Sequence, residues 1–88
     1  MNGCFGCDPA NPVGLGITFA AEPDGRLVAS WVPHRHHVGI GDVVNGGLLS
    51  LLAEELAAAV AAREWDGGVV VIRTEIRFHR PARVQTEL

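Results

Sequence analysis

The clearest pattern in the chain is an apolar stretch with helical spacing. Large apolar residues recur there every three or four positions, at Leu49, Leu52, Leu56 and Val60. This spacing predicts a helix that begins at about Gly47, ends at Arg63 or Glu64 and buries those four residues as one ridge. Residues 66–68 (DGG) are expected to break it. Glu54 falls opposite the ridge among small residues, which favours a groove or an interface there.

Two shorter apolar-rich segments, residues 16–20 and 26–32, precede the predicted helix. They flank residues 22–25 (EPDG), a turn signal, so the pattern predicts a β-hairpin. Residues 1–14 form an irregular lead-in, and residues 33–44 form a loop rich in His and Gly. The expected domain organisation is one domain over residues 1–88.

After the predicted helix, apolar and polar residues alternate with a period of two. Residues 69–71 are uniformly apolar, and from Ile72 to Phe78 apolar and polar side chains alternate up to Pro81. Alternation is typical of a half-buried strand, so residues 69–78 are predicted to form one. Residues 85–88 are expected to begin another.

Composition and charge narrow the class of protein. The chain has 88 residues, 48% of them hydrophobic, and a net charge of −3. Its seven basic residues are all Arg and form no cluster near either end, which disfavours nucleic acid as a partner. The apolar run at residues 48–62 is too short to span a bilayer, and residues 1–4 do not resemble a secretory leader. We therefore expect a cytoplasmic protein without a membrane partner, with both cysteines reduced.

The segment Asn45-Gly46-Gly47 at the predicted start of the helix is the main candidate for chemistry. Glycines at a helix N-terminus leave backbone N–H groups uncovered, and these can bind an oxygen that gains negative charge. Glu54 follows on the same helix, and a carboxylate with such a turn can hydrolyse an activated acyl group. The alternative is that Asn45 caps the helix, the glycines permit close packing, and Glu54 and Glu55 face water.

Several segments together resemble the hotdog-fold acyl-CoA thioesterases of the phenylacetate-degradation type. In chain order they are residues 4–7 (CFGC), 11–15 (NPVGL), 37–39 (HVG), 44–47 (VNGG), Glu54 and 78–81 (FHRP). The resemblance implies an α+β fold, in which a hotdog-like antiparallel sheet wraps around one central helix. The family continues through further strands beyond the position of Leu88, so we expect a shortened member with the last strands of the fold missing.

The resemblance also implies a function and its residues. Acyl-CoA thioesters would be hydrolysed at the interface of a homo-oligomer, a homodimer or a dimer of dimers. Glu54 occupies the place of the family's catalytic Asp or Glu and would act as base or nucleophile, while the N–H of Gly46 or Gly47 polarises the carbonyl. Asn45 stands where the family usually has His. The residues expected to bind substrate are His37, Gly39, Ser50, Arg77 and Arg80, with no metal and no cofactor.

Two other classes of function stay open. Asn45 and the short C-terminus are compatible with a non-catalytic acyl-CoA-binding protein or a degenerate hotdog subunit. Cys4 and Cys7 have the spacing of a zinc or redox motif, but a structural zinc site needs four ligands. The loop histidines His34, His36 and His37 would complete such a site only if the loop folds back onto the N-terminus.

Overall fold

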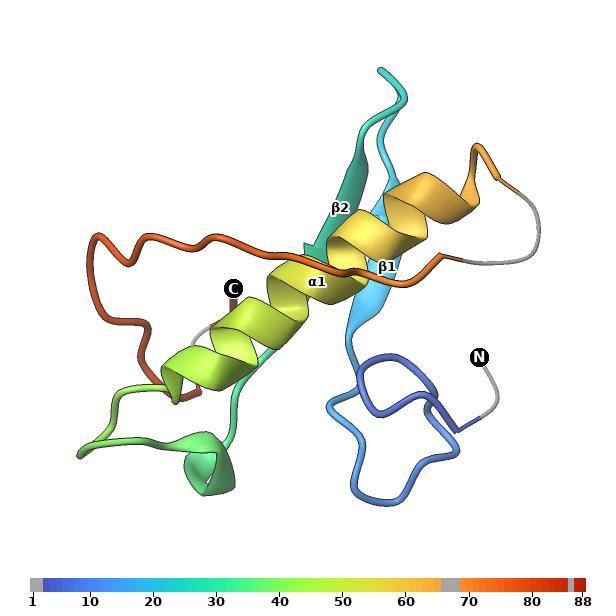
Figure 1. The fold of residues 1–88 in the computed structure, drawn as a ribbon. Helices are drawn as coiled ribbons and strands as arrows, with labels where there is room; N and C mark the ends of the chain where they lie inside the picture. Colours follow the sequence, from blue (N-terminus) through green and yellow to red (C-terminus); the bar gives the residue numbers. More distant parts are fainter. Residues whose placement is uncertain (1–2, 66–68, 86) are drawn as a thin grey trace.

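The computed structural model describes residues 3–65, 69–85 and 87–88. In chain order its elements are strand β1 (Thr18–Ala21), strand β2 (Leu27–Ser30), the 3₁₀ helix η1 (Arg35–His37) and helix α1 (Gly46–Ala62) (Figure 1). A two-stranded antiparallel sheet and one long helix are compatible with the predicted α+β, hotdog-like class. No helix in these described ranges is long and apolar enough to cross a membrane.

The predicted hairpin is confirmed. β1 pairs antiparallel with β2 in a register that sets Thr18 opposite Ser30 and Ala21 opposite Leu27. The N–H of Glu22 donates to the carbonyl of Arg26 at 2.7 Å and closes the connecting turn. Gly25 lies in this turn with a φ of +91°, a conformation that glycine adopts without steric cost.

The predicted helix is also confirmed, with small differences at its ends. α1 begins at Gly46, one residue earlier than expected, and ends at Ala62, with Arg63 as its C-cap. The residues expected to break it, 66–68, lie outside the described part of the chain.

The hydrophobic core lies against the first half of α1. Its buried members come from the segments that flank the hairpin and precede α1, and they are Leu15, Ile17, Trp31 and Val44. The indole N–H of Trp31 donates to the carbonyl of Leu15 at 3.0 Å, which satisfies the buried polar group of the largest core side chain. Four leucines of α1 pack on this core, Leu48, Leu49, Leu51 and Leu52.

Of the ridge predicted to be buried, Leu49 and Leu52 are partly buried and pack on the core, whereas the prediction is wrong for Val60. Val60 is 43% exposed, and Leu56 is only partly buried. The core ends after the first turns of the helix, so the last turns have no apolar layer to pack on. Trp65, which follows the helix, is 63% exposed in the single chain.

The prediction of a strand at residues 69–78 is wrong. This segment lies beside α1 in an irregular conformation, and no backbone hydrogen bond joins residues 69–81 to another described segment (Figure 1). A strand needs a neighbouring strand to pair its backbone groups, and among the described residues this segment has no such partner. The alternation of apolar and polar residues indicates which side chains share a face, but it does not show that a second strand is available to pair with the segment.

Residues 85, 87 and 88, the described part of the strand predicted at residues 85–88, form no strand, although Leu88 pairs with Trp31 as a strand residue does. Leu88 and Trp31 exchange both backbone hydrogen bonds, at 2.8 and 3.4 Å, as opposite residues do in an antiparallel ladder. Trp31 directly follows β2, so the end of the described chain lies along the continuation of this strand.

Candidate functional site

Asn45 organises the N-terminus of α1. Its side-chain oxygen Oδ1 accepts a hydrogen bond from the N–H of Gly47 at 2.8 Å, and its carbonyl accepts from the N–H of Leu48 at 3.0 Å. Asn45 is thus the N-cap, as the alternative interpretation of the sequence proposed. One of the two glycine N–H groups expected to bind an oxyanion already has an acceptor.

Gly46 is the other glycine, and its N–H is available. No acceptor for this N–H lies among the described residues, although Gly46 is the first residue of the helix. Gly46 lines a mainly apolar cleft together with Val43, Val44, Leu49 and residues 78–82. A Cβ atom at Gly46 would lie 3.4 Å from Cζ of Phe78, so glycine keeps the N–H accessible beside this ring.

Glu54 lies in a second, more polar cleft farther along the same face of α1. The cleft is lined by Ser50, Glu54 and residues of the segment beside the helix, Val71, Ile72, Arg73, Thr74, Ile76 and Phe78. Glu54 is half-buried there. Phe78 lines both this cleft and the cleft that contains Gly46.

Ser50 lies between Gly46 and Glu54 on the helix. Its hydroxyl donates to the carbonyl of Gly46 at 3.1 Å, one turn back along the helix. Gly46, Ser50 and Glu54 follow at intervals of four residues and share one side of α1. At 1.5 Å per residue, Gly46 and Glu54 are about 12 Å apart along the helix axis.

His37 and Gly39 shape the loop that leads into the helix. The His37 ring is 8% exposed, lies 5.0 Å from the Trp31 ring and accepts a hydrogen bond at Nδ1 from the N–H of His34 at 2.8 Å. The carbonyl of His37 accepts from the N–H of Asn45 at 2.9 Å, which fixes the residue that caps α1. Neither His37 nor Gly39 lines the clefts at Gly46 and Glu54, so the structure does not bring these two predicted substrate contacts to them.

The imidazole of His37 is the perturbed histidine of this loop. Burial lowers its pKa below the ordinary value of 6.5, and the nearby charges of His36 and His34 lower it further. The neutral ring is therefore favoured, which suits its place against Trp31.

The two predicted arginine contacts differ in position. Arg80 lines the cleft that contains Gly46, whereas Arg77 is exposed and lines neither cleft. Arg73 forms an exposed ion pair with Glu75, two residues along the same segment. Among these arginines, Arg80 is the one that the structure places beside the accessible Gly46 N–H.

The sequence reasoning did not assign Phe78 to the site. Its ring packs beside Gly46 and borders both clefts, although it is 54% exposed. The alternating pattern gave the available signal, because it placed Phe78 on the same side as Thr74 and Ile76, which line the cleft with Glu54.

Comparison with known proteins adds one match. The family model described as Thioesterase superfamily matches residues 41–88, more than half of the chain, and the matched segment includes Asn45, Gly46 and Glu54. No curated protein and no solved structure matches the chain significantly. The match is to the superfamily as a whole and does not single out the phenylacetate-degradation type.

Proposed function

The chain belongs to the Thioesterase superfamily, and we propose that it hydrolyses acyl-CoA thioesters to a free acid and coenzyme A. Membership indicates thioester hydrolysis in general. The observation that carries the finer proposal is the accessible N–H of Gly46 at the start of α1, with Glu54 on the same side of that helix.

Gly46 would polarise the thioester carbonyl. Its N–H lacks an acceptor within the described residues and lies at the positive end of a helix of 17 residues. A tetrahedral intermediate places negative charge on the carbonyl oxygen, and a donor held in advance stabilises that charge without rearranging. The Asn45 cap supports this role, because it holds the first turn in place while occupying only the N–H of Gly47.

Glu54 would supply the carboxylate that acts on the carbonyl carbon. As a general base it takes a proton from water, the water oxygen bonds to the carbon, and the C–S bond breaks to release the coenzyme A thiol. As a nucleophile its oxygen bonds to the carbon directly, the thiolate leaves and takes up a proton, and water then hydrolyses the mixed anhydride. Both routes require the carboxylate within about 3 Å of the reacting atoms.

One copy of the helix does not meet this requirement. Gly46 and Glu54 are about 12 Å apart along the axis of α1, and they line two different clefts. We therefore propose that each site combines Gly46 of one copy with Glu54 of a second copy, in a homodimer or a dimer of dimers.

Exposed apolar side chains support pairing with a second copy. Ile72 is 95% exposed and Val70 87%, both in the segment beside α1, and Trp65, which follows the helix, is 63% exposed. An apolar surface that remains open in the single chain is typical of an interface between chains. Residues 69–78 would there find the pairing partner that the single chain does not provide.

Arg80 is the proposed contact for a phosphate of coenzyme A. It lines the cleft with Gly46, and a guanidinium binds phosphate oxygens with two parallel N–H groups. Arg77 is exposed and would reach such a phosphate only from the rim of the site. Ser50 would contribute by orienting the first turn of the helix through its bond to Gly46.

The test is hydrolysis of a panel of aliphatic and aromatic acyl-CoAs by the 88-residue chain. Loss of thioester absorbance is the suitable readout, since a thiol-reactive dye would also label Cys4 and Cys7. We expect Glu54→Gln to lower kcat by about 100- to 10,000-fold, and the matched variant Glu64→Gln, at an exposed position after the helix, to retain activity. Substrate binding without turnover in the folded wild-type chain would instead identify a non-catalytic acyl-CoA-binding protein.

A further inference from the structure

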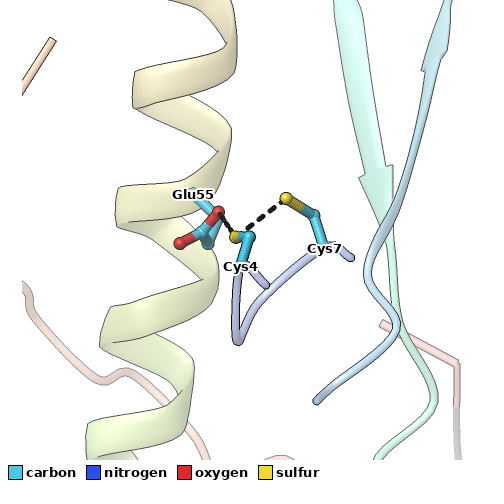
Figure 2. Close-up of side chains that lie close together, drawn as sticks. All are labelled: Cys4, Cys7 and Glu55. Carbon is cyan, nitrogen blue, oxygen red and sulfur yellow. Dashed lines mark hydrogen bonds between the residues drawn. The ribbon is translucent and has the colours of Figure 1, made fainter. Parts of the chain in front are cut away.

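A second group of reactive side chains lies apart from the clefts at Gly46 and Glu54. Cys4 and Cys7 of the N-terminal loop meet Glu55 of α1, and one ligand atom from each lies within 4.8 Å of the other two (Figure 2). The Sγ atoms of Cys4 and Cys7 are 2.9 Å apart, and Cys4 Sγ is 3.5 Å from Oε2 of Glu55. All three residues are partly buried. The sequence analysis lacked a further ligand for the two cysteines, and Glu55 supplies it from 51 residues away.

The loop is shaped to receive this carboxylate. Gly6 lies between the cysteines and is buried, and a Cβ atom there would come within 2.6 Å of both Cγ and Cδ of Glu55. Only glycine lets the backbone approach the carboxyl group so closely. The loop is held from the other side, because the carbonyls of Phe5 and Gly6 accept hydrogen bonds from Leu15 and Ile17 at 2.7 and 2.9 Å.

The electrostatics of the cluster favour a cation. The pKa of the Cys7 thiol is raised from 9.0 to about 12, first by burial and then by the hydrogen bonds and charges of Cys4 and Glu55. The negative charges of Cys4 and Glu55 thus oppose the ionisation of the Cys7 thiol. A bound metal ion reverses this effect, because it stabilises the thiolates and the carboxylate together.

We propose that Cys4, Cys7 and Glu55 form a binding site for a zinc-class divalent ion. Two thiolates and one carboxylate select zinc over magnesium or calcium, which prefer oxygen ligands only. A tetrahedral zinc ion with Zn–S bonds of about 2.3 Å holds its two sulfurs about 3.7 Å apart, so the cysteine side chains must separate by under about 1 Å. A solvent molecule completes the fourth position.

A disulfide between the cysteines explains less of the arrangement. It would bring the sulfurs to about 2.05 Å and has no use for a carboxylate. The contact of Gly6 with Glu55 and the convergence of three ligand atoms are both accounted for by a metal ion. The bound ion would attach the N-terminal loop to the middle of α1 through Glu55, the residue next to Glu54.

Cobalt(II) is the probe for the experiment, since tetrahedral cobalt bound to thiolates absorbs in the visible and near ultraviolet. The whole chain is reduced without a chelating thiol, freed of metal and titrated with cobalt(II) and then with zinc(II) as competitor. We expect one cobalt per chain, a thiolate-to-cobalt band that Cys4→Ser or Cys7→Ser abolishes, and displacement by zinc. Glu55→Gln should weaken cobalt binding by about tenfold or more, whereas the matched variant Glu64→Gln should bind like the wild type.

Gly6→Ala provides a second test that keeps all three ligands. Its Cβ would displace the Glu55 carboxyl group, so cobalt affinity should fall while two thiols per chain still titrate. Circular dichroism checks that each variant is folded. The proposal is overturned if the folded, reduced wild type binds no cobalt, if Glu55→Gln and Gly6→Ala leave the affinity unchanged, or if the cysteines form a disulfide in the presence of zinc.

Discussion

The side-chain oxygen of Asn45 accepts a hydrogen bond from the N–H of Gly47 at 2.8 Å. This contact gives the two glycines different roles in the proposed site. The N–H of Gly47 donates to the helix cap, whereas the N–H of Gly46, a residue that lines the apolar cleft, has no acceptor among the described residues. The proposed hydrolysis therefore depends on one glycine for its oxyanion donor and on the other for the geometry of the turn.

The donor role of Gly46 predicts a strong effect of removing its N–H. Proline suits the first position of a helix, and Asn45 has φ −56° and ψ 128°, in the range that a residue before proline adopts. Gly46→Pro should therefore fold and lower kcat for acyl-CoA hydrolysis by about 100- to 1,000-fold. Gly46→Ala keeps the N–H and adds only a Cβ beside Phe78, so it should lose far less. Equal losses in the two variants would assign the effect to the Phe78 contact instead.

The capping role of Asn45 predicts a loss of stability. Asn45→Ala removes the acceptor of the Gly47 N–H and should lower the free energy of unfolding by about 1 kcal/mol. Asn45→Ser keeps a side-chain acceptor and should lose only part of this. Urea denaturation at one fixed protein concentration measures both, because unfolding of an oligomer depends on concentration. An unchanged midpoint for Asn45→Ala would contradict the capping role.

His37 predicts a dependence of stability on pH. Folding lowers the pKa of this ring, so as the pH falls below 6.5 the unfolded chain takes up the proton before the folded chain does. The free energy of unfolding should therefore decrease as the pH falls from 6.5 to the lowered pKa of His37. Below that pKa, protonation of His37 should cause no further decrease. His37→Asn, which can still accept the bond from His34, should lack this part of the pH dependence. Thermal unfolding of both proteins between neutral and acidic pH checks it.

The sequence predicted those features that depend on local patterns. The turn at residues 22–25 and the apolar spacing of residues 48–60 are local signals, and the hairpin and α1 follow from them. Local signals of this kind do not predict where along the helix the core lies. Val60 continues the periodicity of Leu49 and Leu52 but has nothing to pack on, because Trp31 and its neighbours cover only the first turns of the helix.

The parts of the candidate sites that were missed depend on contacts between distant segments. Alternation in residues 69–78 predicted a strand, yet pairing needs a partner strand that the single chain does not offer. Glu55 looked like the solvent-facing neighbour of Glu54, and only the folded chain brings it to Cys4 and Cys7. His37 was expected at the substrate, but its pairing with the backbone of His34 buries it under the loop.

The proposed homo-oligomer predicts that a charge on the exposed apolar surface weakens association. Val70 is 87% exposed in the single chain, and burying a valine at an interface contributes about 1.5 kcal/mol or more. Val70→Asp should therefore raise the dissociation constant by about tenfold or more in sedimentation experiments. Val13→Asp, at a 73% exposed position of the N-terminal loop, is the matched control. A wild-type chain that sediments as a monomer at all concentrations would refute the oligomer.

The most direct test of the central proposal, a site shared between two copies, is complementation. Glu54→Gln and Gly46→Pro are each expected to be nearly inactive alone, and the two chains are then unfolded, mixed in equal amounts and refolded together. If Gly46 of one copy acts with Glu54 of the other, each mixed dimer has one intact site and one doubly altered site, and random pairing restores about a quarter of wild-type activity. A refolded mixture that contains mixed dimers but is no more active than the separate variants would contradict the proposal, because both residues would then have to act from the same chain.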